Sequence, residues 1–325
     1  MTAFFARFFS ANNRNGILFT MFAAAILSYC LSIGYVLLWN PEIRFWKYAA
    51  EYKLEEVASL RAEQNGAITF CYGGSSTAFG IDSGYASDQL AYPMINLGLH
   101  AGMGAEALSG FGLSQLQPGD TLLVMLEPDL IVAEDMRTPL GEQFGYAMGD
   151  SSILSWRSGE GEPRQFMTTL PSLRPGALNI FSMVGKIILG RPIYRYHRND
   201  LRPGGLVITD VRGEIVGKNG VVKGLRDESR ILLRSLVFAA EERGARAFYC
   251  PPWALFNPEV VERVQSHRIR FLKQVEQEIP VIWEPGLGIL TNREDFSDSP
   301  QHLTGRGARF RTESLVRVLR KSTGR

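Results

Sequence analysis

The chain of 325 residues carries 35 Lys and Arg against 33 Asp and Glu, a formal net charge of +2, and 45% of its residues are hydrophobic. This length predicts one or two globular domains, and a near-neutral charge without a basic stripe argues against a nucleic-acid partner. The three cysteines (Cys30, Cys71 and Cys250) form neither a CxxC motif nor a zinc-ligand spacing. No dinucleotide fingerprint or nucleotide-binding loop is visible, so no metal or other cofactor is expected.

The N-terminal region predicts a membrane anchor. Residues 1–16 contain Arg7 and Arg14 and are expected to form a cytoplasmic tail, and residues 17–39 then run for 23 positions without a charge. At 1.5 Å per residue this stretch can cross a hydrocarbon core of ~30 Å. A cleaved signal peptide is the alternative, but the apolar stretch is longer than an ordinary signal core. Charges flank both ends of the span, so they leave its orientation open.

The rest of the chain predicts an α/β fold. Charged and apolar residues alternate over 40–64, which indicates a linker helix leading off the membrane with its charges on a solvated face. From residue 65 onward, strands and helices alternate, as in a parallel sheet that is covered on both faces. The expected strands are 67–72, 93–97, 121–126, 245–250 and 280–284, and the expected helices are 83–90, 104–116, 226–243, 258–278 and 306–321.

Residues 134–222 interrupt this alternation and are too long for an ordinary connection, so we expect an insertion with some structure of its own. Within it, the apolar stretch 177–190 predicts a core helix, with a lid or a membrane-surface helix as alternatives. Residues 206–216 alternate enough to predict a hairpin.

Two segments at opposite ends of this region carry polar groups suited to catalysis. The expected strand 67–72 breaks into Gly73-Gly74-Ser75-Ser76, at the sheet edge where ligands bind in open α/β folds. Such a turn is compatible with a serine nucleophile whose neighbouring N–H groups face a developing oxyanion, but this segment alone favours a simple tight βα turn. Near the C-terminus, Asp298 precedes His302 and could orient its imidazole as a base on a serine, with Asp295 as the alternative acid.

These motifs together resemble the SGNH (GDSL-type) hydrolase superfamily: Gly74-Ser75-Ser76, the segment 96–104 (NLGLHAGMG), and the segment 298–303 (DSPQHL). The chain is most similar to the membrane-anchored bacterial branch that includes the alginate O-acetylation proteins and the D-alanine transfer protein of teichoic-acid systems. The resemblance covers about residues 65–325 and implies a flavodoxin-like three-layer sandwich with about five parallel strands. Two features depart from the family: Leu126-Glu127-Pro128-Asp129 replaces the usual Gly-x-Asn-Asp block, and the Asp–His spacing is four instead of three.

The resemblance implies roles for particular residues. Ser76 aligns with the nucleophile, with Ser75 as the alternative or as a substrate contact, while His302 would be the base and Asp298 its orienting acid. We therefore expect Ser76 Oγ to lie within hydrogen-bond reach of one His302 ring nitrogen and Asp298 to contact the other.

The oxyanion hole and substrate contacts are expected nearby. The backbone N–H groups of Ser76 and Gly98 are candidate donors, as is the side chain of Asn96, which is equally typical of a turn. His100 and Glu127 are candidate substrate contacts. The alternative for His100 is helix capping or packing, and the alternative for Glu127 is a loop acid paired with an arginine.

The resulting functional hypothesis is a serine-dependent O-acetylesterase or O-acyltransferase that acts on an exported cell-surface polysaccharide through an acyl-serine intermediate. The alternative is a non-catalytic, membrane-anchored accessory subunit of a polysaccharide modification or export complex. The expected location is the bacterial inner membrane, with one span and the domain in the periplasm. The expected partners are the polysaccharide, the membrane and a multispanning acyltransferase or polysaccharide synthesis complex.

Overall fold

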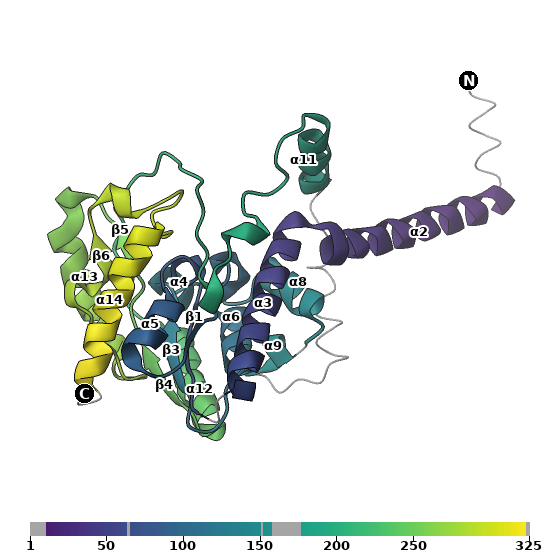
Figure 1. Cartoon of the computed structure of the whole chain (residues 1–325). Helices are drawn as coiled ribbons and strands as arrows, with labels where there is room; N and C mark the ends of the chain where they lie inside the picture. The colour runs from purple at the N-terminus through teal and green to yellow at the C-terminus, as the bar shows by residue number, and fades with distance from the viewer. Residues whose placement is uncertain (1–10, 64–65, 151, 158–176, 323–325) are drawn as a thin grey trace.

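The computed structural model describes residues 11–63, 66–150, 152–157 and 177–322, so most of the expected cytoplasmic tail and residues 158–176 of the expected insertion lie outside the described residues. The chain begins with helix α2 (Ala11–Gly34), which continues through the π-helical turn η1 (Tyr35–Trp39). Residues Gly16–Trp39 are long and apolar enough to cross a membrane. Helix α2 projects away from the rest of the molecule with its apolar side chains exposed (Figure 1).

Helix α3 (Pro41–Glu63) is part of the folded domain, which corrects the expectation of a linker helix. It buries one apolar side against the main core, including Ile43, Trp46 and Val57. Lys53, expected on a solvated face, is completely buried instead. The hydrogen bonds that this ammonium group makes inside the domain replace those that water would otherwise supply.

The central sheet has four parallel strands in the order β2-β1-β3-β4, which confirms the α/β fold class. The strands are β1 (Thr69–Gly73), β2 (Met94–Asn96), β3 (Thr121–Met125) and β4 (Arg246–Tyr249). The fifth expected strand, 280–284, forms only a single bridge, between Val281 and Tyr249. Pro280 has no N–H to donate and Pro285 starts a 3₁₀ turn, so the pairing is not extended. A separate two-stranded pair, β5 (Ala254–Leu255) and β6 (Ile289–Leu290), was not expected.

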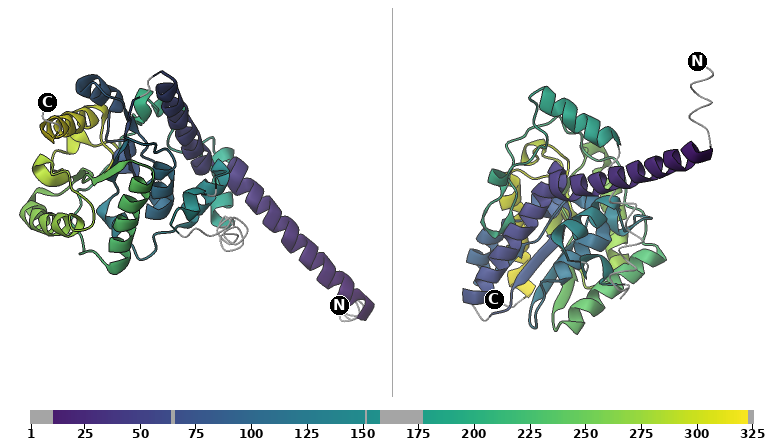
Figure 2. Two further views of the ribbon diagram at one scale, coloured as in Figure 1. Left: turned by 90° about the horizontal axis from the view of Figure 1, so that it is seen from below. Right: turned by 90° about the vertical axis from the view of Figure 1, so that its right-hand side faces the viewer.

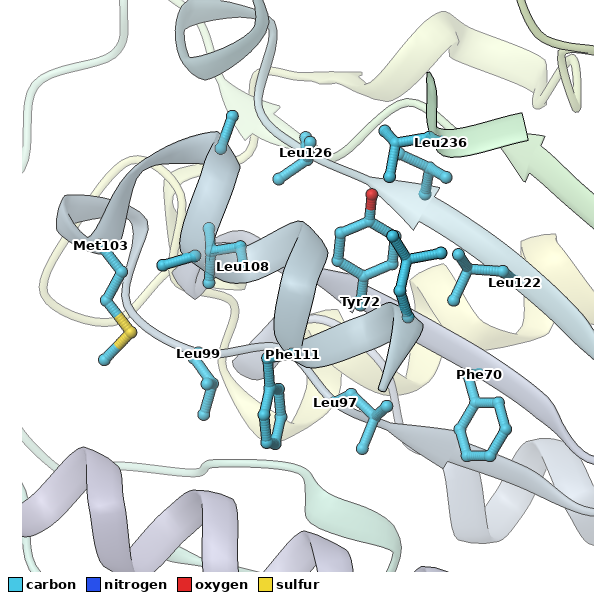
Figure 3. Packing of buried hydrophobic residues seen from close by; sticks show 14 of the residues in the cluster. Phe70, Tyr72, Leu97, Leu99, Met103, Leu108, Phe111, Leu122, Leu126 and Leu236 are labelled. Carbon is cyan, nitrogen blue, oxygen red and sulfur yellow. The ribbon is translucent and has the colours of Figure 1, made fainter. Parts of the chain in front are cut away.

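Helices cover both faces of the sheet and complete a three-layer arrangement (Figures 1 and 2). Helices α3, α6 (Gly104–Leu113) and α12 (Asp227–Glu242) share one core cluster with side chains of the strands, and α13 (Val261–Val275) packs onto the same cluster. Helices α5 (Ser83–Leu90) and α14 (Gly305–Ser322) form the other cluster. Figure 3 shows Tyr72, Leu108, Phe111 and Leu236 packed in the first cluster. A Cβ at Gly112 would lie 2.7 Å from the Tyr72 ring, so this glycine allows α6 to approach the sheet closely.

The insertion contains helices α8 (Pro139–Met148), α9 (Ser152–Ser155) and α11 (Ala177–Ile188), followed by the 3₁₀ turns η4 (Arg198–Asp200) and η5 (Pro203–Gly205). The prediction of a core helix over 177–190 is wrong, because Phe181 is 72% exposed and Ile188 is 77% exposed. Apolar composition alone does not distinguish a helix that is buried in protein from one whose apolar side remains open.

The hairpin predicted over residues 206–216 is also absent from the structure. Val207 forms an antiparallel bridge with Leu201, and its N–H donates to the Ala78 carbonyl at 2.8 Å. The N–H of Ile208 donates to the Asp200 carbonyl at 2.7 Å. The backbone groups that would pair in a hairpin are thus used by neighbours from other parts of the chain.

Candidate active site

The turn after β1 is built by glycines at the carboxyl edge of the sheet. β1 ends at Gly73, Gly74 caps the short helix α4 (Ser75–Ala78), and both residues lie against the end of β3. A Cβ at Gly73 would collide with the Met125 carbonyl, and one at Gly74 would collide with the Glu127 carboxylate. These close approaches explain the two glycines without any need for an unusual backbone angle.

Glu127 binds this turn from the end of β3. Its Oε2 accepts the Gly74 N–H at 3.1 Å and its Oε1 accepts the Ser76 N–H at 3.0 Å, and the residue is only 2% exposed. The carboxylate thereby satisfies two of the N–H groups that a helix N-terminus leaves unpaired. The Ser76 N–H, an expected oxyanion donor, is therefore already occupied. Glu127 is not a solvent-exposed loop acid, and no arginine of the described residues forms an ion pair with it.

The two adjacent serines have different environments. Ser76 is fully buried, and among the described residues its Oγ has no hydrogen-bond partner, so the expected bond to His302 is not formed. Ser75 remains 5% exposed. The Phe79 N–H donates to the Ser75 carbonyl at 2.9 Å, and residues four apart in a helical turn lie on the same side. The side chains of Ser75 and Phe79 thus share one side of this turn.

His302 lies on that side, with its ring stacked on Phe79 at a centroid distance of 4.3 Å and an interplanar angle of 13°. Its Nδ1 is 2.8 Å from Asp298 Oδ1. A carboxylate bonded to Nδ1 favours the tautomer that carries its proton there, which leaves Nε2 as the basic nitrogen. The structure therefore gives His302 the orientation that a general base needs.

Asp298 has further partners that were not found from the sequence, including the neighbouring Ser297 hydroxyl, which donates to its Oδ1 at 3.2 Å. Arg195 Nη1 and the Tyr196 hydroxyl donate to its Oδ2 at 2.8 and 2.9 Å. The same hydroxyl is 3.2 Å from His302 Nδ1. Burial by itself would raise the pKa of Asp298, but hydrogen bonds and charge from His302, followed by those from Arg195 and Tyr196, hold that pKa well below its ordinary value. Asp298 is thus kept ionised beside the imidazole.

The loop that presents His302 is held by its own backbone. The Ser297 N–H donates to the His302 carbonyl at 2.9 Å, and the Thr304 N–H donates to the Asp295 carbonyl at 2.8 Å, just before α14 begins. The side chain of Asp295, the alternative orienting acid, forms an ion pair with Arg306 at 2.9 Å. Asp295 therefore serves this loop and does not contact the imidazole.

Asn96 and Gly98 are used to hold α4 against β2. The Asn96 amide donates to the carbonyls of Thr77 and Ile81 at 2.8 and 2.9 Å, and its Oδ1 accepts the Gly98 N–H at 2.9 Å. Both expected oxyanion donors are therefore engaged within the chain, as the alternative interpretation of Asn96 as a turn residue anticipated.

Lys53 supports the segment that follows β2 and packs against α4. Its Nζ donates to the carbonyls of Asn96, Gly98 and Gly205 at 2.9, 2.8 and 2.6 Å. Burial lowers the pKa of Lys53 to about 7. Helix α3, which follows the apolar N-terminal helix, thus supports the loop that packs on α4.

His100 lies close to His302, but it also has a structural contact. Its Nδ1 accepts the Gly102 N–H at 3.0 Å, which caps the 3₁₀ turn Ala101–Met103, and its Nε2 is 3.8 Å from Glu42. Burial, and then the charge of His302, lowers the pKa of His100 to about 4. His100 is therefore neutral near pH 7, with its proton on Nε2.

A cavity of about 100 Å³ lies beside the loops that follow Glu127 and precede His302. It is lined by Pro128, Asp129, Trp253 and Gln301, among other residues. A small group bound there would touch both loops of the candidate site.

Comparison with known proteins adds little to this geometry. No protein-family model matches the chain, and no curated protein does. Among solved structures, the chain is similar to an acetyl xylan esterase from the rumen bacterium Butyrivibrio proteoclasticus, at 10% sequence identity and a TM-score of 0.30. The match covers 80% of this chain and 64% of that esterase, so the chain spans less than two-thirds of the esterase's length. The functional proposal is therefore based on the site itself.

Proposed function

We propose that the protein is a membrane-anchored serine acyl-ester enzyme, an O-acetylesterase or O-acyltransferase that acts on an exported polysaccharide. The observation that carries the proposal is the Asp298–His302 pair, bonded at 2.8 Å and stacked on Phe79. Phe79 lies one helical turn from the serines that begin α4, just after β1. The resemblance of these motifs to SGNH-type hydrolases supports the same reaction class. With α2 as an uncleaved anchor, the extracytoplasmic substrates that the resemblance implies would place the domain in the periplasm, where such polymers pass.

Ser75, and not Ser76, is the better nucleophile in this geometry. Its side chain shares a side of the helical turn with Phe79, on which His302 is stacked, whereas the Ser76 hydroxyl is sealed from solvent. Glu127 takes the N–H groups on both sides of Ser75, while the Ser75 N–H itself bonds to none of the described residues. This N–H is the available oxyanion donor, because it lies on the nucleophile's own backbone.

The reaction follows from these positions. The Ser75 hydroxyl attacks the acyl carbonyl as His302 Nε2 takes its proton, and Asp298 stabilises the resulting imidazolium. The imidazolium returns the proton to the leaving oxygen, and the acyl group stays on Ser75. Water or a sugar hydroxyl then attacks the acyl-serine and gives its proton to His302. His302 returns that proton to Ser75 Oγ as the acyl–oxygen bond breaks, which releases the acid or the new ester and restores the enzyme.

The test is fluorophosphonate labelling of the full-length protein in detergent, with Ser75→Ala and Ser76→Ala as a matched pair. We expect Ser75→Ala to lose labelling and Ser76→Ala to retain it, while His302→Ala slows labelling and ester turnover by about a thousandfold. Loss of labelling only in Ser76→Ala would assign the nucleophile to the residue that the sequence favours. Absence of labelling in the folded wild-type protein would overturn the enzyme proposal.

A non-catalytic accessory subunit is the second candidate, and one observation favours it. The Glu127 carboxylate occupies the N–H group of Ser76, the serine that the resemblance would make the nucleophile. An accessory subunit would remain unlabelled and would co-purify with a multispanning acyltransferase from its native membrane.

A further inference from the structure

Helix α11 exposes an apolar surface that no other described part of the chain covers. Phe181, Ile187, Ile188 and Leu189 are 72%, 53%, 77% and 66% exposed, and Val184 is 42% exposed. The helix has 12 residues, or about 18 Å at 1.5 Å per residue, which is too short to cross a hydrocarbon core of ~30 Å. An exposed apolar cluster of this kind is typical of a surface that binds a membrane or another protein.

The position of α11 indicates that the membrane is what this surface contacts. Ile180 and Met183, on its inner side, pack against Tyr35 and Val36, where the apolar N-terminal helix meets the domain. Figure 1 shows α11 beside this junction, and the two further views in Figure 2 agree. If α2 crosses a membrane, the exposed side of α11 therefore lies at the level where the bilayer surface begins.

The charge around α11 favours an anionic surface. Residues 177–199 contain no Asp or Glu. Their basic side chains Lys186, Arg191 and Arg198 are exposed, whereas Arg195 is paired with Asp298. Basic residues beside exposed Phe, Ile and Leu are the pattern of helices that lie in the interface of membranes containing anionic lipids.

We propose that α11 is an interfacial helix that inserts its exposed apolar side chains into the anionic bilayer surface beside the anchor. This goes beyond the proposed function, because it assigns a second membrane contact. The segment that follows α11 carries Arg195 and Tyr196, both of which hold Asp298. The contact would therefore fix the candidate site at the bilayer surface instead of leaving it on a free tether.

The test uses the full-length protein in lipid nanodiscs with an environment-sensitive fluorophore on single cysteines. Cys30→Ser removes the exposed thiol, and Cys71 and Cys250 are buried. Labels are placed by Phe181→Cys and by Ile188→Cys on α11. The control is Phe238→Cys on α12, where the native side chain is 62% exposed. Figure 1 shows α12 on a part of the domain away from α2.

With phosphatidylglycerol in the disc, doxyl-lipid quenching should be several-fold stronger at positions 181 and 188 than at 238, and iodide quenching several-fold weaker. Discs of phosphatidylcholine alone should reduce this difference. Iodide quenching equal to that at 238 would overturn the proposal. Protection from iodide without doxyl quenching would also overturn it, because another protein surface, such as a second copy, would then cover the helix. An equal signal in both lipids would overturn the requirement for anionic lipid.

Discussion

Replacement of Glu127 by alanine should destabilise the domain strongly, although Glu127 lies on no helix or strand. Its carboxylate is buried and is the acceptor for the N–H groups of Gly74 and Ser76. Alanine would leave both donors without an acceptor at the end of two central strands, where little water can reach them.

The magnitude follows from the number of donors. A buried group that loses its partner costs about 1–3 kcal/mol, so two unpaired N–H groups predict a fall of about 2–6 kcal/mol in the free energy of unfolding. Glu127→Gln keeps one acceptor oxygen but turns an NH₂ group toward the second N–H. It should therefore cost about 1–3 kcal/mol, the penalty for one unpaired donor.

The assay is urea unfolding in detergent followed by tryptophan fluorescence, since the chain has five tryptophans. Glu294→Ala is the matched control, because the Glu294 side chain is 80% exposed and its change should stay within about 0.5 kcal/mol. If both Glu127 variants unfold at the same urea concentration as Glu294→Ala, the carboxylate does not hold this turn, and our account of the two serines fails with it.

Two further predictions concern the groups around His302. The folded pKa of His100, about 4, lies below the ordinary 6.5, so the unfolded chain takes up a proton that the folded chain does not, and stability should fall as pH drops from about 6.5 to about 4. The loss approaches ~3 kcal/mol, and urea unfolding at several pH values should show it in the wild type but not in His100→Gln; parallel pH profiles would contradict this. Tyr196→Phe removes a hydrogen bond to the ionised Asp298 and should cost about 1.5–3 kcal/mol at pH 7. Because the folded pKa of Asp298 is depressed, this cost should persist down to about pH 4 and shrink only as the pH falls through the folded value, and a cost that grows on acidification would refute the assignment.

The elements of the fold were predictable where their signals are local. The expected helix 83–90 coincides with α5, which Asp82 caps by accepting the Tyr85 N–H, and the expected strands 93–97 and 121–126 contain β2 and β3. The Asp298–His302 contact is of the same kind, because residues four apart in one tight loop meet without help from the rest of the fold. Hydrophobic periodicity, capping residues and short spacings each depend on residues that are close in the sequence, so a single sequence is enough to detect them.

The partners of the site were decided by tertiary structure alone. Tyr196 reaches Asp298 across 102 positions, and Glu127 reaches Ser76 across 51. Which of two adjacent serines is sealed and which shares a side with Phe79 depends on the rotation of a four-residue helix whose first N–H groups Glu127 binds. The exposure of α11 likewise depends on what lies beside it. These contacts join segments that are far apart in the sequence and meet only in the folded chain. Local sequence patterns therefore predict the helices and strands, whereas long-range packing decides which side chains meet at the candidate site.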